Sequence, residues 1–155
     1  MKEAIQTLIT SDKMAHAFEY LKQDEAHTID QQIELVQISS FSPFEEKRAI
    51  RFKELLTEAG LDPVMDEVHN VYAHIHGTGN GPTLYVSAHL DTVFPPETPL
   101  PVKREGTKIY APGIGDDTRG LAEILTLARA IKESGLKPVG DIIIGGNVGG
   151  EGLGD

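Results

Sequence analysis

Apolar residues recur every three or four positions along the first part of the chain, a spacing that places them on one face of a helix. Residues 4–21 show a broken version of this pattern, with Ile5, Leu8 and Phe18 among the apolar positions. Residues 28–39 show a second version. The pattern therefore predicts two helices before residue 40.

A third helix has end signals as well as spacing. Ser42 can cap its N-terminus, Pro43 suits the first helical position, and Glu45 completes a Ser-x-x-Glu capping box. Apolar residues then continue at helical spacing as far as Ala59, and Gly60 supplies a stop signal. We therefore expect a helix that begins near Pro43 and ends before Gly60.

The hydrophobic period changes to two after residue 70. Residues 71–76 alternate between apolar and polar side chains, which predicts a half-buried strand. The remaining elements that the pattern predicts are a buried strand at 84–88, a short strand at 108–111, a helix at 119–134 that ends near Gly135, and a central strand at 141–144.

Strands that alternate with helices predict an α/β fold, with a layered mixed or mostly parallel sheet flanked by helices. The length of 155 residues suits one domain, which we expect to span residues 1–155. Sheets of this class bind ligands at the carboxyl ends of their strands. The residues that follow the predicted strands are therefore the first candidates for a site.

Composition narrows the possible partners. The net charge of −10 argues against a nucleic-acid partner, because such surfaces are normally basic. The absence of Cys excludes disulfides and thiolate metal ligands. No apolar run approaches the roughly 20 residues of a membrane span, and residues 1–9 lack the features of a signal peptide. We therefore expect a cytoplasmic protein that does not contact a membrane.

Three short motifs carry the residue types of a metal site. They are Ser-Ala-His-Leu-Asp-Thr-Val at 87–93, Gly-Ile-Gly-Asp-Asp-Thr-Arg-Gly at 113–120 and Gly-Gly-Glu-Gly at 149–152. His89, Asp116 and Glu151 offer one imidazole and two carboxylates, a set that suits zinc and tolerates cobalt or manganese. These residues lie far apart in sequence, so they can share an ion only if the fold brings the strand ends together.

In this order the motifs resemble those of the M20 family of metallopeptidases. The family includes peptidase T-like tripeptidases, carboxypeptidase G-type enzymes, acetylornithine deacetylases and succinyl-diaminopimelate desuccinylases. The resemblance covers essentially the whole chain and corresponds to the N-terminal part of the catalytic domain. It implies a zinc-peptidase-like fold, two Zn²⁺ ions per site with Co²⁺ or Mn²⁺ as substitutes, and a homo-oligomer. The chain ends before the lid and dimerisation domain and the later metal ligands that the resemblance implies.

The resemblance also implies a role for each residue. His89 and Glu151 would bind one metal, and Asp116 would bridge two metals. Asp91 would hold the His89 ring and raise its basicity. The bridging role goes to Asp116 because family members commonly have an Ala six residues later. The resemblance further implies a cis peptide bond after this residue.

One position departs from the family pattern. Where the family has a glutamate that acts as general base on the attacking water, this chain has Gly150. General acid–base catalysis contributes roughly 10²–10⁴-fold to a rate, and glycine has no side chain to supply it. We therefore expect a metal-dependent hydrolase site for the amide bonds of short peptides or N-acyl amino acids, in a chain that is inactive alone.

Two other interpretations stay open. The chain can be a non-catalytic protein, either a pseudoenzyme or a residual metal-binding module. It can also be a piece of a longer hydrolase in which Gly150 is an engineered replacement or a sequence variant. A peptidase is favoured among the hydrolases because Asp-Asp-x-x-Gly-x-Ala-Glu at 116–123 resembles the tripeptidase branch.

A further pair of histidines lies outside these motifs. His74 and His76 alternate with apolar residues on one predicted strand, so both point to the same face. They can chelate a metal, or they can simply belong to the solvent-exposed face of the strand. The alternating pattern favours the second interpretation, because the polar positions of such a strand normally face solvent.

Overall fold

The computed structural model describes residues 2–151, which form five helices and six strands. The helices are α1 (Lys2–Ile9), α2 (Asp12–Gln23), α3 (Glu25–Val36), α4 (Glu46–Glu58) and α5 (Thr118–Ser134). The strands are β1 (Val64–Met65), β2 (Val71–Ile75), β3 (Leu84–His89), β4 (Lys103–Glu105), β5 (Lys108–Tyr110) and β6 (Ile142–Asn147).

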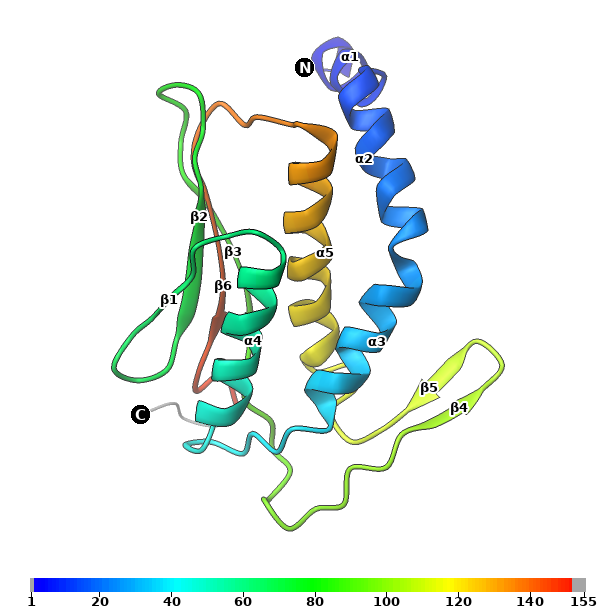
Figure 1. The fold of residues 1–155 in the computed structure, drawn as a ribbon, viewed down its shortest axis with the longest axis vertical. Coiled ribbons are helices and arrows are strands. Elements are labelled where there is room, and N and C mark those ends of the chain that lie inside the picture. The colour runs from blue at the N-terminus through cyan, green and yellow to red at the C-terminus, as the bar shows by residue number, and fades with distance from the viewer. Residues whose placement is uncertain (1, 152–155) are drawn as a thin grey trace.

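Four strands form one mixed sheet in the order β1-β2-β6-β3. β3 and β6 are parallel, whereas β2 runs antiparallel to both β1 and β6. The apolar run before Gly145 therefore lies in a central strand, as the sequence predicts. β4 and β5 form a separate hairpin that stands away from the sheet (Figure 1). This arrangement confirms the expected α/β fold with a mixed sheet flanked by helices.

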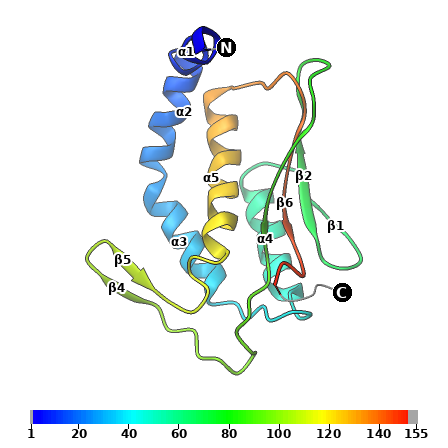
Figure 2. The ribbon, with the colours of Figure 1, turned by 180° about the vertical axis from the view of Figure 1, so that it is seen from behind.

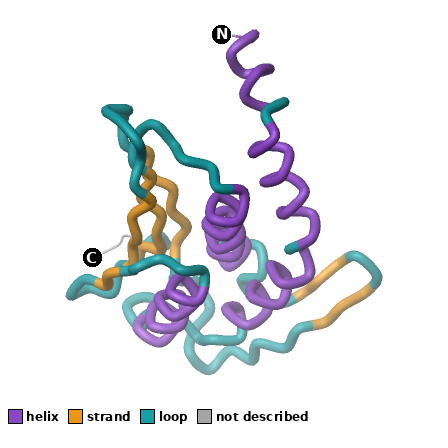
Figure 3. The backbone as a smooth tube through the Cα atoms, turned by 45° about the horizontal axis from the view of Figure 1, so that its top comes forward, coloured by secondary structure: helices purple, strands orange, loops and turns teal. Residues whose placement is uncertain are grey.

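The helices cover one face of this sheet in two layers. α4 and α5 lie directly on the strands, and α2 and α3 pack against the outer side of α5 (Figures 1 and 2). The core between sheet and helices is apolar, and its largest members are fully buried: Leu35, Phe52, Leu55, Leu56, Leu90, Leu121, Leu125 and Ile144. Seen with its top turned forward, the sheet has helices beside only one of its faces (Figure 3).

The outer helices are joined to α5 by a buried polar cluster. Asp24 lies between α2 and α3, and one of its oxygens accepts hydrogen bonds from Arg129 at 2.6 and 2.9 Å and from Thr126 at 2.7 Å. Gln31 accepts from the same guanidinium at 2.8 Å. Because each charged group has an opposite charge and hydrogen-bond partners, the cluster fixes how the two helical layers meet.

The helix ends follow local signals in most places. The broken pattern at 4–21 becomes two helices, and the Ser11 hydroxyl caps the second by accepting a hydrogen bond from the Met14 amide at 3.4 Å. α3 begins and ends three residues earlier than the predicted 28–39. At the end of α4, Gly60 adopts a φ of +83° and its N–H bonds to the Thr57 carbonyl, as expected for a glycine C-terminal signal.

The predicted start of α4 is wrong. The helix begins at Glu46, and Glu45 occupies the N-cap without a side-chain capping bond. Ser42 and Pro43 lie before the helix and are joined by a cis peptide bond. The Glu45 carboxylate is instead directed at the loop after β6, so a tertiary contact has replaced the local capping box.

The prediction that residues 84–88 form a buried strand is also wrong. The strand exists, but Leu84 and Tyr85 are each 56% exposed. β3 lies at the edge of the described sheet, and only one face of that sheet has helices against it. Ala88, which faces α5, is buried. The apolar character of the run therefore does not report burial on both faces.

Among residues 2–151, no helix combines the length and apolar character that a membrane crossing requires.

Candidate metal centre

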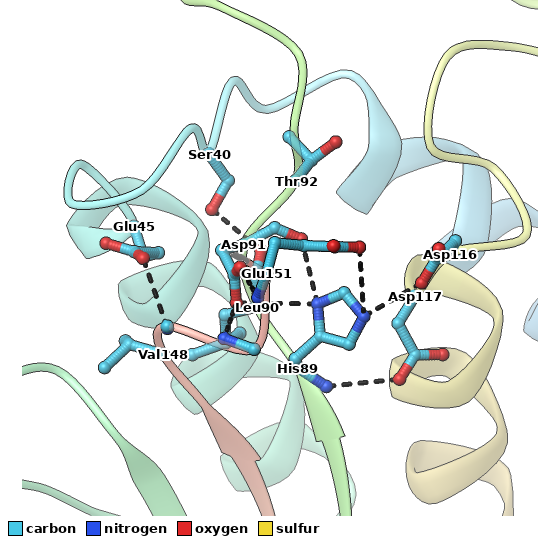
Figure 4. Close-up of polar contacts among 12 residues, drawn as sticks. Ser40, Glu45, His89, Leu90, Asp91, Thr92, Asp116, Asp117, Val148 and Glu151 are labelled. Atoms are coloured by element: carbon cyan, nitrogen blue, oxygen red, sulfur yellow. Dashed lines mark hydrogen bonds and ion pairs between the residues drawn. The ribbon is translucent and has the colours of Figure 1, made fainter. Parts of the chain in front are cut away.

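The parallel strands β3 and β6 end side by side and bring two of the sequence motifs together. His89 is the last residue of β3 and pairs in register with Asn147, the last residue of β6. The loop that follows β6 carries Glu151. The loop before α5 carries Asp116 and approaches from the other side (Figure 4). The site therefore forms at the carboxyl ends of two parallel strands, where open α/β sheets bind their ligands.

The three predicted ligands converge at this place. The His89 Nε2 atom lies 2.9 Å from Asp116 Oδ1 and 3.9 Å from Glu151 Oε1. One nitrogen and one oxygen from each carboxylate all lie within 4.8 Å of one another. One imidazole and two carboxylates are ligands that Zn²⁺ accepts, and they also suit Co²⁺ or Mn²⁺. The donor set and its convergence therefore fit a divalent metal ion.

Asp91 contacts both the His89 ring and the loop that carries Glu151. It is fully buried, and its carboxylate and backbone oxygens lie 3.4 and 3.1 Å from His89 Nδ1. Its two carboxylate oxygens accept hydrogen bonds from the amides of Gly150 at 2.8 Å and Glu151 at 2.7 Å. The first contact places Asp91 where it can orient the ring, which is the role that the family resemblance implies. The second contact, which ties the Glu151 loop to β3, was not anticipated.

Asp117 fixes the backbone around the candidate metal ligands. Its Oδ1 accepts a hydrogen bond from the Gly120 amide at 3.1 Å and caps α5. Its Oδ2 accepts one from the His89 amide, also at 3.1 Å. The peptide bond between Asp116 and Asp117 is cis, which confirms the expectation drawn from the family resemblance. The two neighbouring aspartates therefore have different contacts, and Asp116 alone approaches the imidazole.

Two further side chains position the loop after β6, and sequence reasoning missed both. Glu45, which is 3% exposed, accepts a hydrogen bond from the Gly149 amide at 3.4 Å. Asn70 accepts one from the Val148 amide at 2.9 Å and donates to Asp66 at 2.9 Å. The sequence assigned Glu45 to helix capping and contained no signal for Asn70. Their role depends on segments that meet only in the folded chain.

A buried arginine holds the backbone between His89 and Asp91. Arg48 Nη1 donates to the Leu90 carbonyl at 2.7 Å, and the Ser40 hydroxyl donates to the same oxygen at 2.8 Å. Burial lowers the pKa of the Arg48 guanidinium to about 10, and the negative charge of Asp91 opposes that shift. The guanidinium therefore stays charged at neutral pH and faces a buried carboxylate that it helps to compensate.

The environment of His89 favours a positive charge. Burial by itself lowers the pKa of the imidazole, but the hydrogen bond to Asp116 and the charges of Asp91 and Asp117 outweigh burial and raise the pKa overall. The same carboxylates that stabilise a bound proton would stabilise a divalent cation in its place. A metal ion must displace that proton, so binding is expected to be pH-dependent.

Comparison with known proteins agrees with this geometry. The sequence profile of peptidase family M20/M25/M40 matches residues 85–154. The chain is 38% identical to carboxypeptidase G2 from Pseudomonas sp. (strain RS-16) over 77 residues, which are 48% of this chain and 18% of that protein. The crystal structure of a tripeptidase from Staphylococcus aureus subsp. aureus Mu50 matches with a TM-score of 0.65 and 30% identity, over 79% of this chain and 36% of that one.

The chain is similar to the M20 metallopeptidase family in its sequence motifs and in its fold.

The match corresponds to the N-terminal part of the M20 catalytic domain. The chain is also 27% identical over 128 residues to the protein YqjE of Bacillus subtilis (strain 168), which covers 74% of this chain. It spans about a third (34%) of the length of that relative. The match therefore does not extend over the remaining two thirds of that relative.

Gly150 is the position at which the family resemblance leads us to expect a glutamate, and the structure leaves no room for a Cβ atom there. A Cβ atom at this position would lie 2.5 Å from the His89 Cβ atom and 2.7 Å from its Cγ atom. Real Cβ atoms essentially never approach so closely, so a larger residue requires the loop or the imidazole to move. Glycine therefore both removes a carboxylate and allows the loop to lie against the His89 ring.

A cavity of about 270 Å³ opens beside the metal ligands. Asp116 and Glu151 form part of its wall, and Val93, Phe94 and Ile114 contribute apolar surface. Sites that enclose a whole drug-sized ligand measure about 300–1,000 Å³, so this space suits one apolar side chain or acyl group. A substrate that placed such a group in the cavity would have its neighbouring bond close to the ligands.

Proposed function

We propose that this chain carries a divalent-metal site of an amide hydrolase, with His89, Asp116 and Glu151 as metal ligands. The observation that carries the proposal is the convergence of one imidazole and two carboxylates at the ends of β3 and β6. Zinc is the ion we propose, because nitrogen and carboxylate ligands suit it and the chain has no thiolate. A second Zn²⁺ bridged by Asp116 is part of the proposal and rests on the M20 resemblance.

The roles of the protein groups follow from their contacts. When bound, a divalent ion supplies Lewis-acid polarisation of a carbonyl and lowers the pKa of water. With the proton of His89 on Nδ1, the Asp91 backbone oxygen accepts a hydrogen bond from that nitrogen, and the Nε2 lone pair is left directed at the other ligands. Asp91 also holds the Glu151 amide, so the imidazole and this carboxylate move as one unit. The site is therefore organised by one buried residue.

We propose short peptides or N-acyl amino acids as substrates. The M20 relationship supports an amide bond, and the cavity beside Asp116 and Glu151 supports an apolar group next to that bond. The tripeptidase-like motif at 116–123 favours peptides. A polar or nucleic-acid substrate has less support, because the cavity wall is largely apolar and the chain carries a net charge of −10.

We propose that hydrolysis by this chain is weak or absent. Gly150 supplies no carboxylate to accept a proton from water and pass it to the leaving amine. The loss of general acid–base catalysis alone reduces a rate by roughly 10²–10⁴-fold. The alternative function is a metal-binding protein without catalysis, and the same feature supports it.

The test separates metal binding from hydrolysis. Zn²⁺ binding to the purified chain is measured by competition with a chromophoric chelator, for the unchanged protein and for His89→Ala and Glu151→Gln. We expect both substitutions to weaken binding at this site. His16→Asn, which changes an exposed histidine on α2, is the matched control and should leave binding unchanged. If His89→Ala binds as many equivalents of Zn²⁺ as the unchanged protein and with the same affinity, the metal site is refuted.

Hydrolysis is assayed on the same samples with a panel of tripeptides and N-acyl amino acids. We expect the protein to release no more amino acid than free Zn²⁺ releases without it. Metal-dependent cleavage that His89→Ala abolishes would overturn the proposal of inactivity, while it would support the metal site and its assignment. The two parts of the proposal can thus fail independently.

A further inference from the structure

We propose a second transition-metal site, formed by His74, His76 and Asp141 on the sheet face that lacks helices. The three side chains offer two imidazole nitrogens and one carboxylate oxygen that all lie within 4.8 Å of one another. His74 lies in β2, His76 follows that strand directly, and Asp141 precedes β6. The sequence showed only the two histidines. The structure supplies the third ligand from a segment far away in the chain.

Sheet register explains why these residues meet. β2 and β6 are antiparallel, with His74 opposite Ile143 and Ile75 opposite Ile142. The next step of the same register sets His76 beside Asp141. Side chains two residues apart on a strand share one face, so both histidines and the aspartate point to the same side. That side is opposite to the core, because Ala73 and Ile75 face the helices.

The ligand geometry suits a small ion after modest adjustment. The ring centroids of His74 and His76 are 5.8 Å apart, and the His76 Nδ1 atom lies 3.9 Å from Asp141 Oδ2. Zinc bonds of about 2.0–2.1 Å in a tetrahedron separate neighbouring ligand atoms by roughly 3.4 Å. Small side-chain rotations close that difference, and both imidazoles are exposed and free to turn.

The backbone beneath the ligands is already held in place. Asp141 Oδ1 accepts a hydrogen bond from the Gly77 amide at 2.8 Å, which leaves Oδ2 directed at His76. The amides of Thr78 and Gly79 donate to the carbonyls of Pro138 and Val139, each at 2.9 Å. These contacts join the loop after β2 to the segment before β6.

Glycine makes this close approach possible. A Cβ atom on Gly77 would lie 2.5 Å from the Gly140 carbonyl carbon, and one on Gly81 would lie 2.5 Å from the Gly140 nitrogen. The two segments therefore run against each other at the upper end of the sheet in Figures 1 and 2. Because the segments are held together without an ion, an ion binds to ligands that are already gathered.

The site is independent of the candidate metal centre. Asp141 directly precedes β6 and Asn147 is its last residue. Six residues at about 3.3 Å each separate the two positions by roughly 20 Å. The ligand type also predicts its selectivity. Imidazoles favour Cu²⁺, Ni²⁺ and Zn²⁺, with Cu²⁺ bound most tightly, over the oxygen-seeking Mg²⁺. A bound ion would act as a clip that joins the end of β2 to the start of β6.

The experiment uses His89→Ala, which removes a ligand of the other site. Isothermal titration of this protein with Zn²⁺, Ni²⁺ and Mg²⁺ should show one equivalent of the first two ions bound at micromolar concentration and none of Mg²⁺. Adding His76→Asn or Asp141→Asn should weaken Zn²⁺ binding by more than about tenfold, since even an outer partner of a ligand contributes 10–100-fold. Adding His16→Asn should leave binding unchanged.

Both test substitutions are compatible with the fold. His76 is 81% exposed, and asparagine at 141 keeps an oxygen for the Gly77 amide. Thermal unfolding of each variant without metal checks this. Absence of Zn²⁺ binding in His89→Ala would overturn the proposal, as would binding that either His76→Asn or Asp141→Asn leaves intact. Equal binding of Mg²⁺ would show attraction to the acidic chain alone and would also overturn it.

Discussion

Replacing Asp91 with asparagine tests whether one buried carboxylate organises the candidate metal centre. The side chain keeps its shape, but one acceptor oxygen becomes an NH₂ donor. In the structure, both oxygens accept amide hydrogen bonds, from Gly150 at 2.8 Å and from Glu151 at 2.7 Å. Asparagine can satisfy only one of these amides. The other amide then faces a second donor on a side chain that is fully buried.

The magnitude follows from these two contacts. A hydrogen bond to a charged group stabilises a fold by about 1.5–3 kcal/mol and a neutral one by about 1 kcal/mol, so losing one and neutralising the other costs roughly 2–4 kcal/mol. Loss of the buried negative charge removes its own desolvation penalty, which offsets part of this cost. It also removes the charge that compensates buried Arg48. We therefore expect Asp91→Asn to lower the free energy of unfolding by about 2 kcal/mol or more.

Metal affinity should fall in parallel. His89 loses the carboxylate charge that lies 3.4 Å from its Nδ1 atom, although the Asp91 backbone acceptor remains, so we expect metal binding to weaken by about tenfold, the lower end of the effect typical for an outer partner of a metal ligand. Urea unfolding without metal measures the first effect, and Zn²⁺ competition measures the second. Asp62→Asn, at an exposed position, is the matched control and should change neither quantity. If Asp91→Asn unfolds at the same urea concentration and binds Zn²⁺ with unchanged affinity, the organising role of Asp91 is wrong.

The remaining predictions concern the fold and assembly. Burial raises the pKa of Asp24, but hydrogen bonds from Thr126 and Arg129 outweigh burial and lower the pKa overall. Its stabilising effect is therefore present above about pH 4 and lost as pH falls further, so Asp24→Asn should show a shallower acid dependence of its unfolding midpoint than the unchanged protein. Gly60→Ala forces alanine to a φ of +83° and should destabilise by about 1–2 kcal/mol in urea unfolding; an unchanged midpoint would contradict this. The exposed edge of β3 should promote a homo-oligomer that Tyr85→Lys weakens, and light scattering that shows only monomer at high concentration would count against it.

Much of the fold could be predicted because its signals are local. The helix α5 follows its apolar spacing and ends where Gly135 takes a φ of +63°. The alternation in β2 gives a strand with one buried face, and the isoleucine run gives a central strand. In each case the residues that determine the element lie within it. Neighbours from elsewhere in the chain reinforce the local preference without changing it.

The predictions that were wrong concern residues whose environment is set by distant segments of the chain. Glu45 has the sequence context of a capping box, but its carboxylate bonds to the Gly149 amide, about a hundred residues later. The apolar strand β3 lies at an edge of the described sheet and leaves Leu84 and Tyr85 exposed. Local pattern cannot report either fact, because each depends on which distant segment lies beside the residue.

For the chemistry, the sequence alone determined the residue types and their likeness to M20 motifs. His89, Asp116, Glu151 and the glycine at 150 can be read without coordinates. Tertiary structure decided how those residues are held, since the amides that Asp91 binds and the cavity beside Glu151 exist only when β3 and β6 lie side by side.

The proposed site at His74, His76 and Asp141 likewise depends partly on the sequence and partly on the tertiary structure. Strand alternation placed His74 and His76 on one face, a property of two positions in a single strand. Only the antiparallel register of β2 and β6 sets Asp141 beside them. A metal site needs ligand atoms within a few ångströms, and distance in space between segments far apart in sequence is set by packing and strand pairing. That is why the two histidines could be named from the sequence, whereas Asp141 and its place beside them could not.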